Sequence, residues 1–445
     1  MTIKVRFAPS PTGYLHVGNV RAALINYLYA KKHNGKFLLR FDDTDLLRSK
    51  DIYRDAIISD LKWLGINYDE IFKQSDNLDR YEECKNILIK SNRLYECYET
   101  QQELAIQRKS QINSGQKPIY NRSALNLTAE QKNNLQKSGI KPYYRFLLDD
   151  KKISWNDKIK GTVTYEGRHF SDPVLIRENS SPTYTFCSVI DDIDHNITDI
   201  IRGEDHVTNT AIQIQIFDSL GFKAPNFAHL SLIQANSGKI SKRIGGFDIK
   251  SLRKNNFEPA TITNFLSQIG TSKSIEIHRN LEQIIADFSF DKFSKSATKY
   301  NIDELEILNH KILQIIDFAE ISKKLNKLGI NDNNVEDFYH KIKPNINFIT
   351  DVKKWHDICF NDFKYNNDKS DQEFLYDIIK YIPDNCSNNN AWQEWLSQIK
   401  QNTTRKGKDL FMPIRLALSG EENGPEIATL INIISKDKII ERLQN

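Results

Sequence analysis

Two short segments carry residue types that suit the chemistry of nucleotide phosphates. The first is His16-Val17-Gly18-Asn19, at the start of a stretch with helical spacing. Backbone N–H groups at a helix start attract anions, and a glycine lets a phosphate approach the backbone closely. The imidazole of His16 can add a hydrogen bond. Taken alone, the same string is as typical of an ordinary loop that turns into a helix.

The second segment is a basic run flanked by glycines, Lys239-Ile240-Ser241-Lys242-Arg243. Ammonium groups on such a loop can neutralise the charge that develops as pyrophosphate leaves, which stabilises a transition state without covalent catalysis. A short basic run by itself is more often a solvated loop. It is the order of the two segments on one chain that favours ATP as a substrate.

The residues around His16 follow the pattern of a βαβ unit. Residues 3–8 alternate like a strand and stop at a loop with two prolines, and helical spacing then runs over 19–32 with Gly35 placed to end the helix. A second strand is predicted over 36–41. A parallel sheet built from such units binds ligands at the carboxyl ends of its strands, which is where the loop 9–19 would lie.

Farther along, the pattern indicates an insertion. Helices are predicted from about 51 to 64 and from about 80 to 90, after which residues 91–185 change character. Within that stretch we expect a polar helix near 100–113 and short strands near 143–148 and 161–165.

The α/β pattern resumes at 184–190 and 199–202, followed by a helix over 210–220, and beyond about 255 the sequence is helical with no alternating strands. The expected fold is therefore α/β. It comprises a Rossmann-type parallel-sheet domain (1–90 and 186–250), an inserted α+β domain (91–185), and all-helical domains at 251–310 and 311–445.

The composition excludes several classes of protein. The length of 445 residues predicts two to four domains. A hydrophobic fraction of 39%, a charged fraction of 27% and a mean hydropathy of −0.55 describe a globular, water-soluble chain. No apolar stretch reaches the roughly 20 residues that span a bilayer, and no signal-peptide pattern opens the sequence, so we expect a cytoplasmic protein without membrane contact.

Charge and cysteine content add little. The net charge of +4 permits a polyanionic partner without requiring one. The five cysteines include no C-x-x-C pair, so neither a disulfide framework nor a zinc ribbon is indicated.

Several segments resemble the class I aminoacyl-tRNA synthetases in their bacterial glutamyl form. Residues 6–19, RFAPSPTGYLHVGN, resemble the first signature region of that family, and KISKR at 239–243 resembles the second. The resemblance covers essentially the whole chain. Further similar stretches follow the family's order at 38–45, 182–186, 200–210, 227–233 and 410–427.

The resemblance implies a ligase that uses ATP and Mg²⁺ to join L-glutamate to the 3′ end of tRNA(Glu) through a glutamyl-adenylate, releasing pyrophosphate and AMP. It implies that 91–185 binds the acceptor end, that 251–310 contacts the tRNA stem, and that 311–445 binds the anticodon. Family members need bound tRNA for efficient activation and are usually monomers. Whether tRNA(Gln) is charged as well stays open.

The same resemblance assigns roles to individual residues. Arg6 matches the arginine that holds the side-chain carboxylate of glutamate, a role suited to a bidentate guanidinium. The catalytic residues would be His16, Gly18, Lys239 and Lys242. The ATP-binding residues would be Pro9, Ser10, His16, Gly18, Asn19, Glu204 and Lys242. The glutamate-binding residues would be Arg6, Ala8, Ser10, Asp42, Tyr184, Ser188 and Arg202, with Ser10, Tyr184 and Arg202 placed at ends of predicted strands.

Three places depart from the family's pattern. Asp42 stands where relatives usually have Glu to hold the substrate's amino group, so we expect a tighter or shifted pocket, and Ser188 stands where Asn is frequent. Some relatives bind zinc in the inserted domain through C-x-C and Y-x-C or Y-x-H. Here those strings are Cys97-Tyr98-Glu99 and Tyr120-Asn121-Arg122, which leave one soft ligand, so no zinc and no other metal ligands are predicted.

Four other functions fit the sequence less well. A glutamyl-queuosine-type relative lacks the anticodon-binding part, which the helical sequence over 310–445 argues against. A glutaminyl form would end in β-barrels. A silent RNA-binding relative would not need His16 and Lys242, and a simple nucleotidyltransferase would leave the long helical end without a role.

Overall fold

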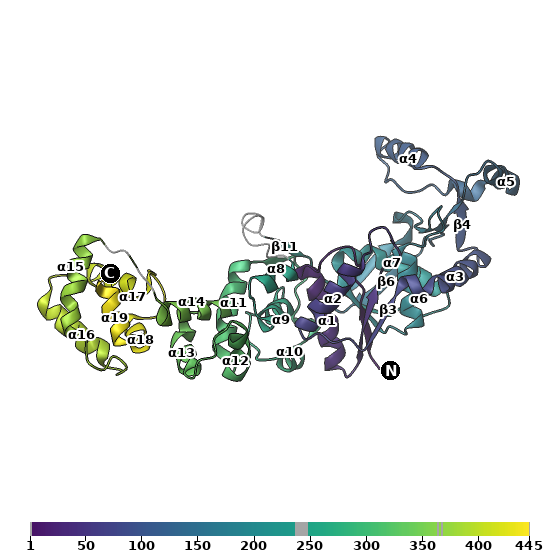
Figure 1. Cartoon of the computed structure of the whole chain (residues 1–445). Coiled ribbons are helices and arrows are strands. Elements are labelled where there is room, and N and C mark those ends of the chain that lie inside the picture. Colours follow the sequence, from purple (N-terminus) through teal and green to yellow (C-terminus); the bar gives the residue numbers. More distant parts are fainter. Residues whose placement is uncertain (1, 236–247, 363–364, 366–367, 445) are drawn as a thin grey trace. The chain divides into compact units, whose positions relative to one another are not determined.

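The computed structural model describes residues 2–235, 248–362, 365 and 368–444 (Figure 1). The chain divides into two compact units, one made of Met1–Lys254 and Ile262–Ile302, the other of Asn255–Thr261 and Asp303–Asn445. Among the described residues, no helix is both long and apolar enough to cross a membrane.

The first unit begins with a parallel three-stranded sheet. Strands β1 (Lys4–Phe7), β2 (Lys36–Phe41) and β3 (Glu70–Lys73) pair in that order. Helices α1 (Val17–Lys32) and α2 (Asp51–Trp63) make the two crossovers. Since β2 is buried from its second residue onward, its near-continuous apolar run suits a strand that is covered on both faces.

A second sheet has the order β7-β6-β10-β9. Its strands are β6 (Lys152–Asp157), β7 (Gly161–Glu166), β9 (Asp199–Gly203) and β10 (Asn226–Leu230), and helix α7 (Val207–Ser219) connects β9 to β10. Strands β6 and β7 thus join this sheet although they lie within the stretch 91–185, with Asp157 opposite Phe227 in the parallel pair β6–β10.

Strands β1 and β9 bring the two sheets together. The backbone N–H of Thr198 donates to the Lys4 carbonyl at 2.9 Å, and the Lys4 N–H donates to Thr198 Oγ1 at 2.9 Å. The spatial order therefore runs β3-β2-β1-β9-β10-β6-β7, and the chain order reverses at the β1–β9 boundary. A reversal of this kind opens a crevice at the carboxyl ends of the strands, where open α/β sheets bind their ligands.

Between β3 and β9 the chain makes an excursion with a small sheet of its own. An antiparallel sheet, β4-β5-β8, packs with helices around Tyr95, Cys97 and Tyr120. The elements are η1 (Gln74–Asn77), α3 (Leu78–Lys90), β4 (Leu94–Cys97), α4 (Gln101–Asn113), η2 (Ser123–Asn126), α5 (Ala129–Lys137), β5 (Tyr143–Phe146), η3 (Gly167–His169), β8 (Val174–Ile176), α6 (Tyr184–Asp194) and η4 (Glu204–His206), the last one following β9.

After β10 the chain is mainly helical. The remaining elements of the first unit are β11 (Ile233–Ala235), α8 (Ile249–Lys254), α9 (Pro259–Gln268), whose first turn belongs to the second unit, α10 (Leu281–Asp287), η5 (Phe290–Lys292) and β12 (Thr298–Tyr300). The second unit packs around a large apolar core that includes Trp355 and Trp395. Its elements are α11 (Ile302–Ile315), α12 (Phe318–Lys327), α13 (Val335–Ile342), η6 (Lys343–Asn345), α14 (Ile349–Phe360), α15 (Lys369–Ile378), η7 (Ile379–Tyr381), α16 (Ala391–Asn402), α17 (Lys408–Ser419), α18 (Ile427–Ile433) and α19 (Lys436–Gln444).

The α/β fold with a helical carboxyl-terminal part confirms the predicted fold class, but four details were wrong or missing. Residues 184–190 belong to helix α6, not to a strand, because a short apolar run does not distinguish the two and the polar residues of α6 are buried as well. Strands β3, β4, β6, β8, β10 and β11 were missed, and β12, which pairs with β11, lies in the region predicted to hold no strands. Gly35 does not end α1 in a left-handed conformation, since Asn34 takes that role with φ 51°. A Cβ on Gly35 would lie 2.4 Å from the Ile3 carbonyl oxygen, so the glycine serves a close approach to β1.

Candidate active site

A cavity of about 540 Å³ lies at the carboxyl ends of β1, β9 and β10, at the chain reversal. A second cavity of about 350 Å³ adjoins it, since Ala8, Ser10, Tyr184 and His206 line both. Nine of the residues predicted to bind substrates line the first cavity: Arg6, Ala8, Pro9, Ser10, His16, Gly18, Asn19, Tyr184 and Arg202.

His16 is the N-cap of helix α1. Its Nδ1 accepts from the backbone N–H groups of Gly18 (3.1 Å) and Asn19 (3.3 Å), so those two groups are not left unpaired for a phosphate as the sequence analysis expected. Burial lowers the pKa of His16, and an accepting Nδ1 places the proton on Nε2. A Cβ on Gly18 would lie 2.9 Å from the imidazole Cε1. The glycine therefore makes room for the capping ring.

Arg6, on β1, is buried and already paired. Its Nε and Nη2 donate to the two carboxylate oxygens of Asp192 on α6, at 2.9 and 3.1 Å. Asp192 also accepts from Arg40 at 3.0 Å. Burial acts to raise the pKa of Asp192, but the two guanidinium groups outweigh it and hold that pKa below its usual value. The charge on Arg6 is thus compensated within the protein.

Arg40, on β2, holds two residues that were predicted to contact glutamate. It donates to both carboxylate oxygens of Asp42, at 2.6 and 3.2 Å, and to the hydroxyl of Ser188 at 3.0 Å. Burial raises the pKa of Asp42 to about 6 even though Arg40 opposes the shift. Asp42 lines the second cavity, whereas Ser188 is fully buried against Arg40 and belongs to neither lining.

A third buried carboxylate, Asp191, completes the cluster. It accepts from Gln74 (2.7 Å), Asn77 (3.2 Å) and the phenol of Tyr81 (2.7 Å), and its oxygen lies 3.7 Å from Arg40 Nε. These partners of Asp191 were not predicted from the sequence. Two adjacent aspartates inside the apolar run of α6 were the available signal, because buried carboxylates are rare unless they are paired.

Arg202, on β9, differs from Arg6 and Arg40. Its Nη2 donates to Thr210 Oγ1 and Gln213 Oε1, both at 2.7 Å, and Nη1 donates to the phenol of Tyr184 at 3.3 Å. All three acceptors are uncharged, and Nε has no hydrogen-bond partner among the described residues. Burial lowers the pKa of Arg202. Its side chain is therefore a buried cation that lines the cavity and makes no ion pair with a carboxylate in the part of the chain that the structure describes, although Asp192 attracts it through space.

The remaining predicted residues lie beside the cavity or outside the described part of the chain. Glu204 pairs with Lys160 at 2.5 Å and accepts from the Leu232 N–H at 3.0 Å, so it closes the rim and does not line the cavity. Lys239 and Lys242 lie outside the described residues.

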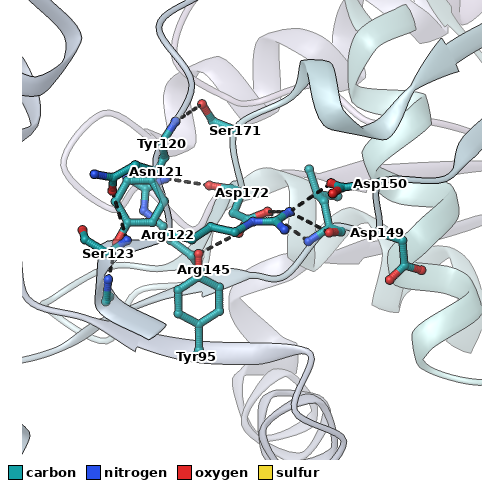
Figure 2. A network of polar contacts seen from close by, with 12 residues as sticks. Tyr95, Tyr120, Asn121, Arg122, Ser123, Arg145, Asp149, Asp150, Ser171 and Asp172 are labelled. Carbon is teal, nitrogen blue, oxygen red and sulfur yellow. Dashed lines mark hydrogen bonds and ion pairs between the residues drawn. The ribbon is translucent and has the colours of Figure 1, made fainter. Parts of the chain in front are cut away.

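The positions that bind zinc in some relatives are occupied by a polar network of another kind. Arg122 donates to both carboxylate oxygens of Asp172, at 2.9 and 3.0 Å, and to the Leu148 carbonyl at 2.7 Å (Figure 2). Asp172 also accepts from the phenol of Tyr95 at 2.7 Å and from the Leu148 N–H at 3.0 Å. Arg122 cannot ligate a metal, because a guanidinium has no lone pair to give.

Glu99 is the centre of the adjoining contacts. It accepts from Tyr120 (2.6 Å), Ser123 (2.7 Å) and Tyr143 (3.2 Å). The Cys97 sulfur lies 3.8 Å from the Tyr120 oxygen, and burial raises the pKa of that thiol to about 12, which disfavours the thiolate that zinc requires. The donor set here does not fit a tetrahedral zinc site.

A crevice at a chain reversal in an α/β sheet, lined by a capped helix start and buried arginines, defines a nucleotide-binding α/β enzyme with a site for an acidic substrate. Comparison with known proteins is consistent with that class. Residues 2–307 match the family described as tRNA synthetases class I (E and Q), catalytic domain, and residues 291–445 match an anticodon binding domain.

Curated proteins match along the full chain. A protein of Rickettsia felis named glutamate–tRNA ligase 1 is 49% identical over 99% of both chains, and one of Rickettsia prowazekii with the same name is 50% identical over 98% of both. A crystal structure of a glutamate tRNA ligase from Elizabethkingia meningosepticum, solved with its amino acid, superposes with a TM-score of 0.85 at 26% identity, covering 100% of this chain and 98% of the other. This chain belongs to the class I tRNA synthetases of the glutamyl and glutaminyl family.

Proposed function

We propose that this chain ligates L-glutamate to the 3′ end of tRNA(Glu), with ATP as the source of energy. The observation that carries the proposal is Arg202, a buried guanidinium that faces a cavity with no carboxylate against it. A buried cation without an ion-pair partner favours an anionic ligand. Arg6 lines the same cavity, but its Nε and Nη2 already donate to Asp192, so Arg202 offers the stronger attraction to an anion. The pocket therefore suits an acidic amino acid.

The reaction needs alignment and charge stabilisation and no protein nucleophile. A carboxylate oxygen of glutamate attacks the α-phosphorus of ATP and pyrophosphate leaves, and the terminal ribose hydroxyl of tRNA then takes the glutamyl group and releases AMP. Arg6 and Arg202 would hold glutamate, while Pro9, Ser10, His16, Gly18 and Asn19 would face ATP. Mg²⁺ on the phosphates would offset their charge. Lys239 and Lys242 would assist the departure of pyrophosphate.

Asp42 would hold the amino group of glutamate from the second cavity. Its carboxylate is bound to Arg40, so the ammonium would share an acceptor that is already occupied. Ser188 would not contact the substrate directly, because its hydroxyl accepts a hydrogen bond from Arg40. We propose that Ser188 acts on glutamate only through Arg40.

The rest of the chain would bind tRNA. We propose that residues 91–185 bind the acceptor end, that 251–310 contact the stem, and that 311–445 bind the anticodon. The match of residues 291–445 to an anticodon binding domain supports the last assignment and disfavours a queuosine-type enzyme, which lacks such a part.

The test is glutamate-dependent exchange between ATP and pyrophosphate, with and without tRNA, followed by charging of purified tRNA(Glu) and tRNA(Gln). We expect exchange only with tRNA, and charging of tRNA(Glu). Absence of exchange under both conditions would overturn the proposal. Full exchange without tRNA would instead point to the queuosine-type alternative.

A further inference from the structure

A chain of buried hydrogen bonds leads from a carboxylate on β6 to Arg202. Asp157 Oδ2 lies 2.5 Å from Nδ1 of His229 on β10, and both side chains are fully buried. His229 Nε2 lies 3.0 Å from Oγ1 of Thr210 on α7, and the same oxygen accepts from Arg202 Nη2 at 2.7 Å. Four side chains from four elements thus form one continuous path, the relay, that ends at the substrate cavity.

The direction of the bonds in the relay follows from the protonation of its members. A guanidinium only donates, so Thr210 accepts from Arg202, and its single proton can go to His229 Nε2 at 3.0 Å or to the His206 carbonyl at 3.3 Å. Burial lowers the pKa of His229, and a neutral imidazole that donates from Nδ1 to Asp157 accepts at Nε2, which favours the shorter contact. An accepting Nε2 puts the imidazole proton on Nδ1, where it is donated to Asp157. No bond in the path has to reverse for the others to form, and mutually polarised bonds of this kind strengthen one another.

Asp157 is a fixed anchor for the relay. One of its oxygens accepts from the backbone N–H groups of Ile159 (3.0 Å), Lys160 (2.9 Å) and His229 (3.2 Å). Burial acts to raise the pKa of Asp157, but the hydrogen bonds to His229 and these backbone groups hold it below the usual value. Asp157 is therefore an ionised carboxylate with no freedom to rotate.

The relay explains how Arg202 is held without a direct ion pair. Thr210 and Gln213 together use both hydrogens of Nη2, which fixes the plane of the guanidinium. Arg6 and Arg40 are each held by a carboxylate in direct contact. In both cases that carboxylate accepts from Nε and Nη2, so this edge of the guanidinium is occupied. Arg202 is instead oriented by neutral oxygens, since Asp192 acts on it only through space and the carboxylate of Asp157 is three hydrogen bonds away.

We propose that Asp157, His229 and Thr210 are positioning residues that orient Arg202 for the carboxylate of the acidic substrate. The proposal rests on the proposed function and deepens it, because it names the residues that orient the glutamate-binding arginine. Thr210 and His229 lie in the segments 200–210 and 227–233 that resemble the family, whereas Asp157 comes from the stretch 91–185, outside those segments.

The test replaces Thr210 by a residue of the same shape. Thr210→Val removes the hydroxyl from the relay, and Thr210→Ser keeps it. We expect Thr210→Val to raise the KM for glutamate about tenfold, equivalent to ~1.4 kcal/mol, while the KM for ATP and the kcat change by less than about twofold. Thr210→Ser should restore most of the affinity for glutamate.

Two further variants separate orientation from general destabilisation. Thr261→Val removes another buried hydroxyl, which donates to Asn309 at 2.8 Å in the second unit, so it should lower the Tm and leave the KM for glutamate unchanged. His229→Asn breaks the relay at a second point. Because Thr210 and His229 act in series, the double variant should raise the KM no more than the larger single change.

The outcomes distinguish the two proposals. A wild-type chain without glutamate-dependent charging refutes the proposed function itself. A wild-type chain that charges tRNA, together with a Thr210→Val variant whose KM for glutamate is unchanged or rises in step with the KM for ATP, refutes the relay alone. Additive effects of Thr210→Val and His229→Asn would also refute it.

Discussion

Two polar clusters in the first unit each hold an arginine, but the partners of the two guanidinium groups differ. In the stretch 91–185, Arg122 meets both oxygens of Asp172 and a backbone carbonyl, so its guanidinium is held by a charge of opposite sign (Figure 2). At the cavity, Arg202 meets three neutral oxygens and keeps Nε without a partner among the described residues.

The difference separates a structural cluster from a binding cluster. A buried ion pair whose donors are satisfied fixes the local structure and has nothing left to offer a ligand. A buried cation without a paired carboxylate destabilises the free protein, and an anionic substrate offsets that destabilisation when it binds. The two clusters should therefore respond in opposite ways when a charge is removed.

The largest effect is expected from Arg202→Gln. Loss of the guanidinium should lower the kcat/KM for glutamate by about 100-fold or more, since removal of a hydrogen-bonded partner of a buried charge typically costs ~2–5 kcal/mol. The Tm of the free protein should stay level or rise, because an uncompensated charge has left the interior. Glutamate titration of the charging rate and thermal melting would check both results, and a large fall in Tm would contradict the comparison.

Asp172→Asn should have the opposite profile. It leaves Arg122 without its carboxylate and should lower the free energy of unfolding by ~1–2 kcal/mol, because the Arg122 side chain is 31% exposed and water can replace part of the contact. The Tm should fall by roughly 2 °C or more. The KM for glutamate should stay within about twofold of the wild-type value, because the pair does not line the cavity. Arg122→Lys is the matched control, since lysine keeps the charge and loses the bidentate contact.

A smaller effect concerns the pH dependence that Asp42 imposes. Its pKa is raised to about 6, so the carboxylate is ionised at neutral pH and becomes protonated as the pH falls through 6. If the ionised form holds the amino group, the KM for glutamate should rise about fourfold between roughly pH 7 and pH 5.5. Asp42→Asn should remove this rise in KM at acidic pH. If the variant shows the same rise, another group is responsible for it.

The same raised pKa has a consequence for stability with the opposite sign. A carboxyl whose pKa is higher in the folded than in the unfolded chain favours folding at low pH. That contribution is fully present below the unfolded pKa of about 4 and is lost as the pH rises to about 6. Tm measurements on wild type and Asp42→Asn over this window would detect it as a difference in slope.

The smallest effect is expected from a chelator. The contacts of Glu99 with Tyr120, Ser123 and Tyr143 need no metal, and Cys97 is held as a thiol, so EDTA should leave the Tm unchanged. The charging rate should also be unchanged once the EDTA has been exchanged for a buffer that contains Mg²⁺. The purified protein should contain substoichiometric zinc by elemental analysis. A stoichiometric content that falls together with the Tm on chelation would show that the cluster ligates zinc.

Local sequence rules predicted the elements whose patterns are long or sharply bounded. Strands β1 and β2 and helix α2 lie within a residue or two of their predicted bounds, because alternation and a terminal glycine mark them clearly. Helix α6 was missed because its buried face carries Ser188, Asp191 and Asp192, polar residues that become intelligible only once Arg6 and Arg40 lie opposite.

The same limit applies to the candidate site. Arg6 and Arg202 could be identified from the segments around them, but the carboxylate that pairs with Arg6 and the one that ends the relay of Arg202 come from distant parts of the chain. Asp192 lies 186 residues from Arg6, and the relay reaches Asp157 only through the pairing of β6 with β10. Which arginine is compensated and which is not is a property of the tertiary structure.

The boundary between β1 and β9 also bears on how the chain is made. Lys4 and Thr198 are 194 residues apart, so one edge of β1 stays unpaired during synthesis until β9 has been translated. An unpaired strand edge on a growing chain is prone to aggregation and is a target for chaperones. Because such distant pairings close slowly, the crevice should be among the last parts of the first unit to form. A chain with a formed pocket is then a chain whose first unit has finished folding.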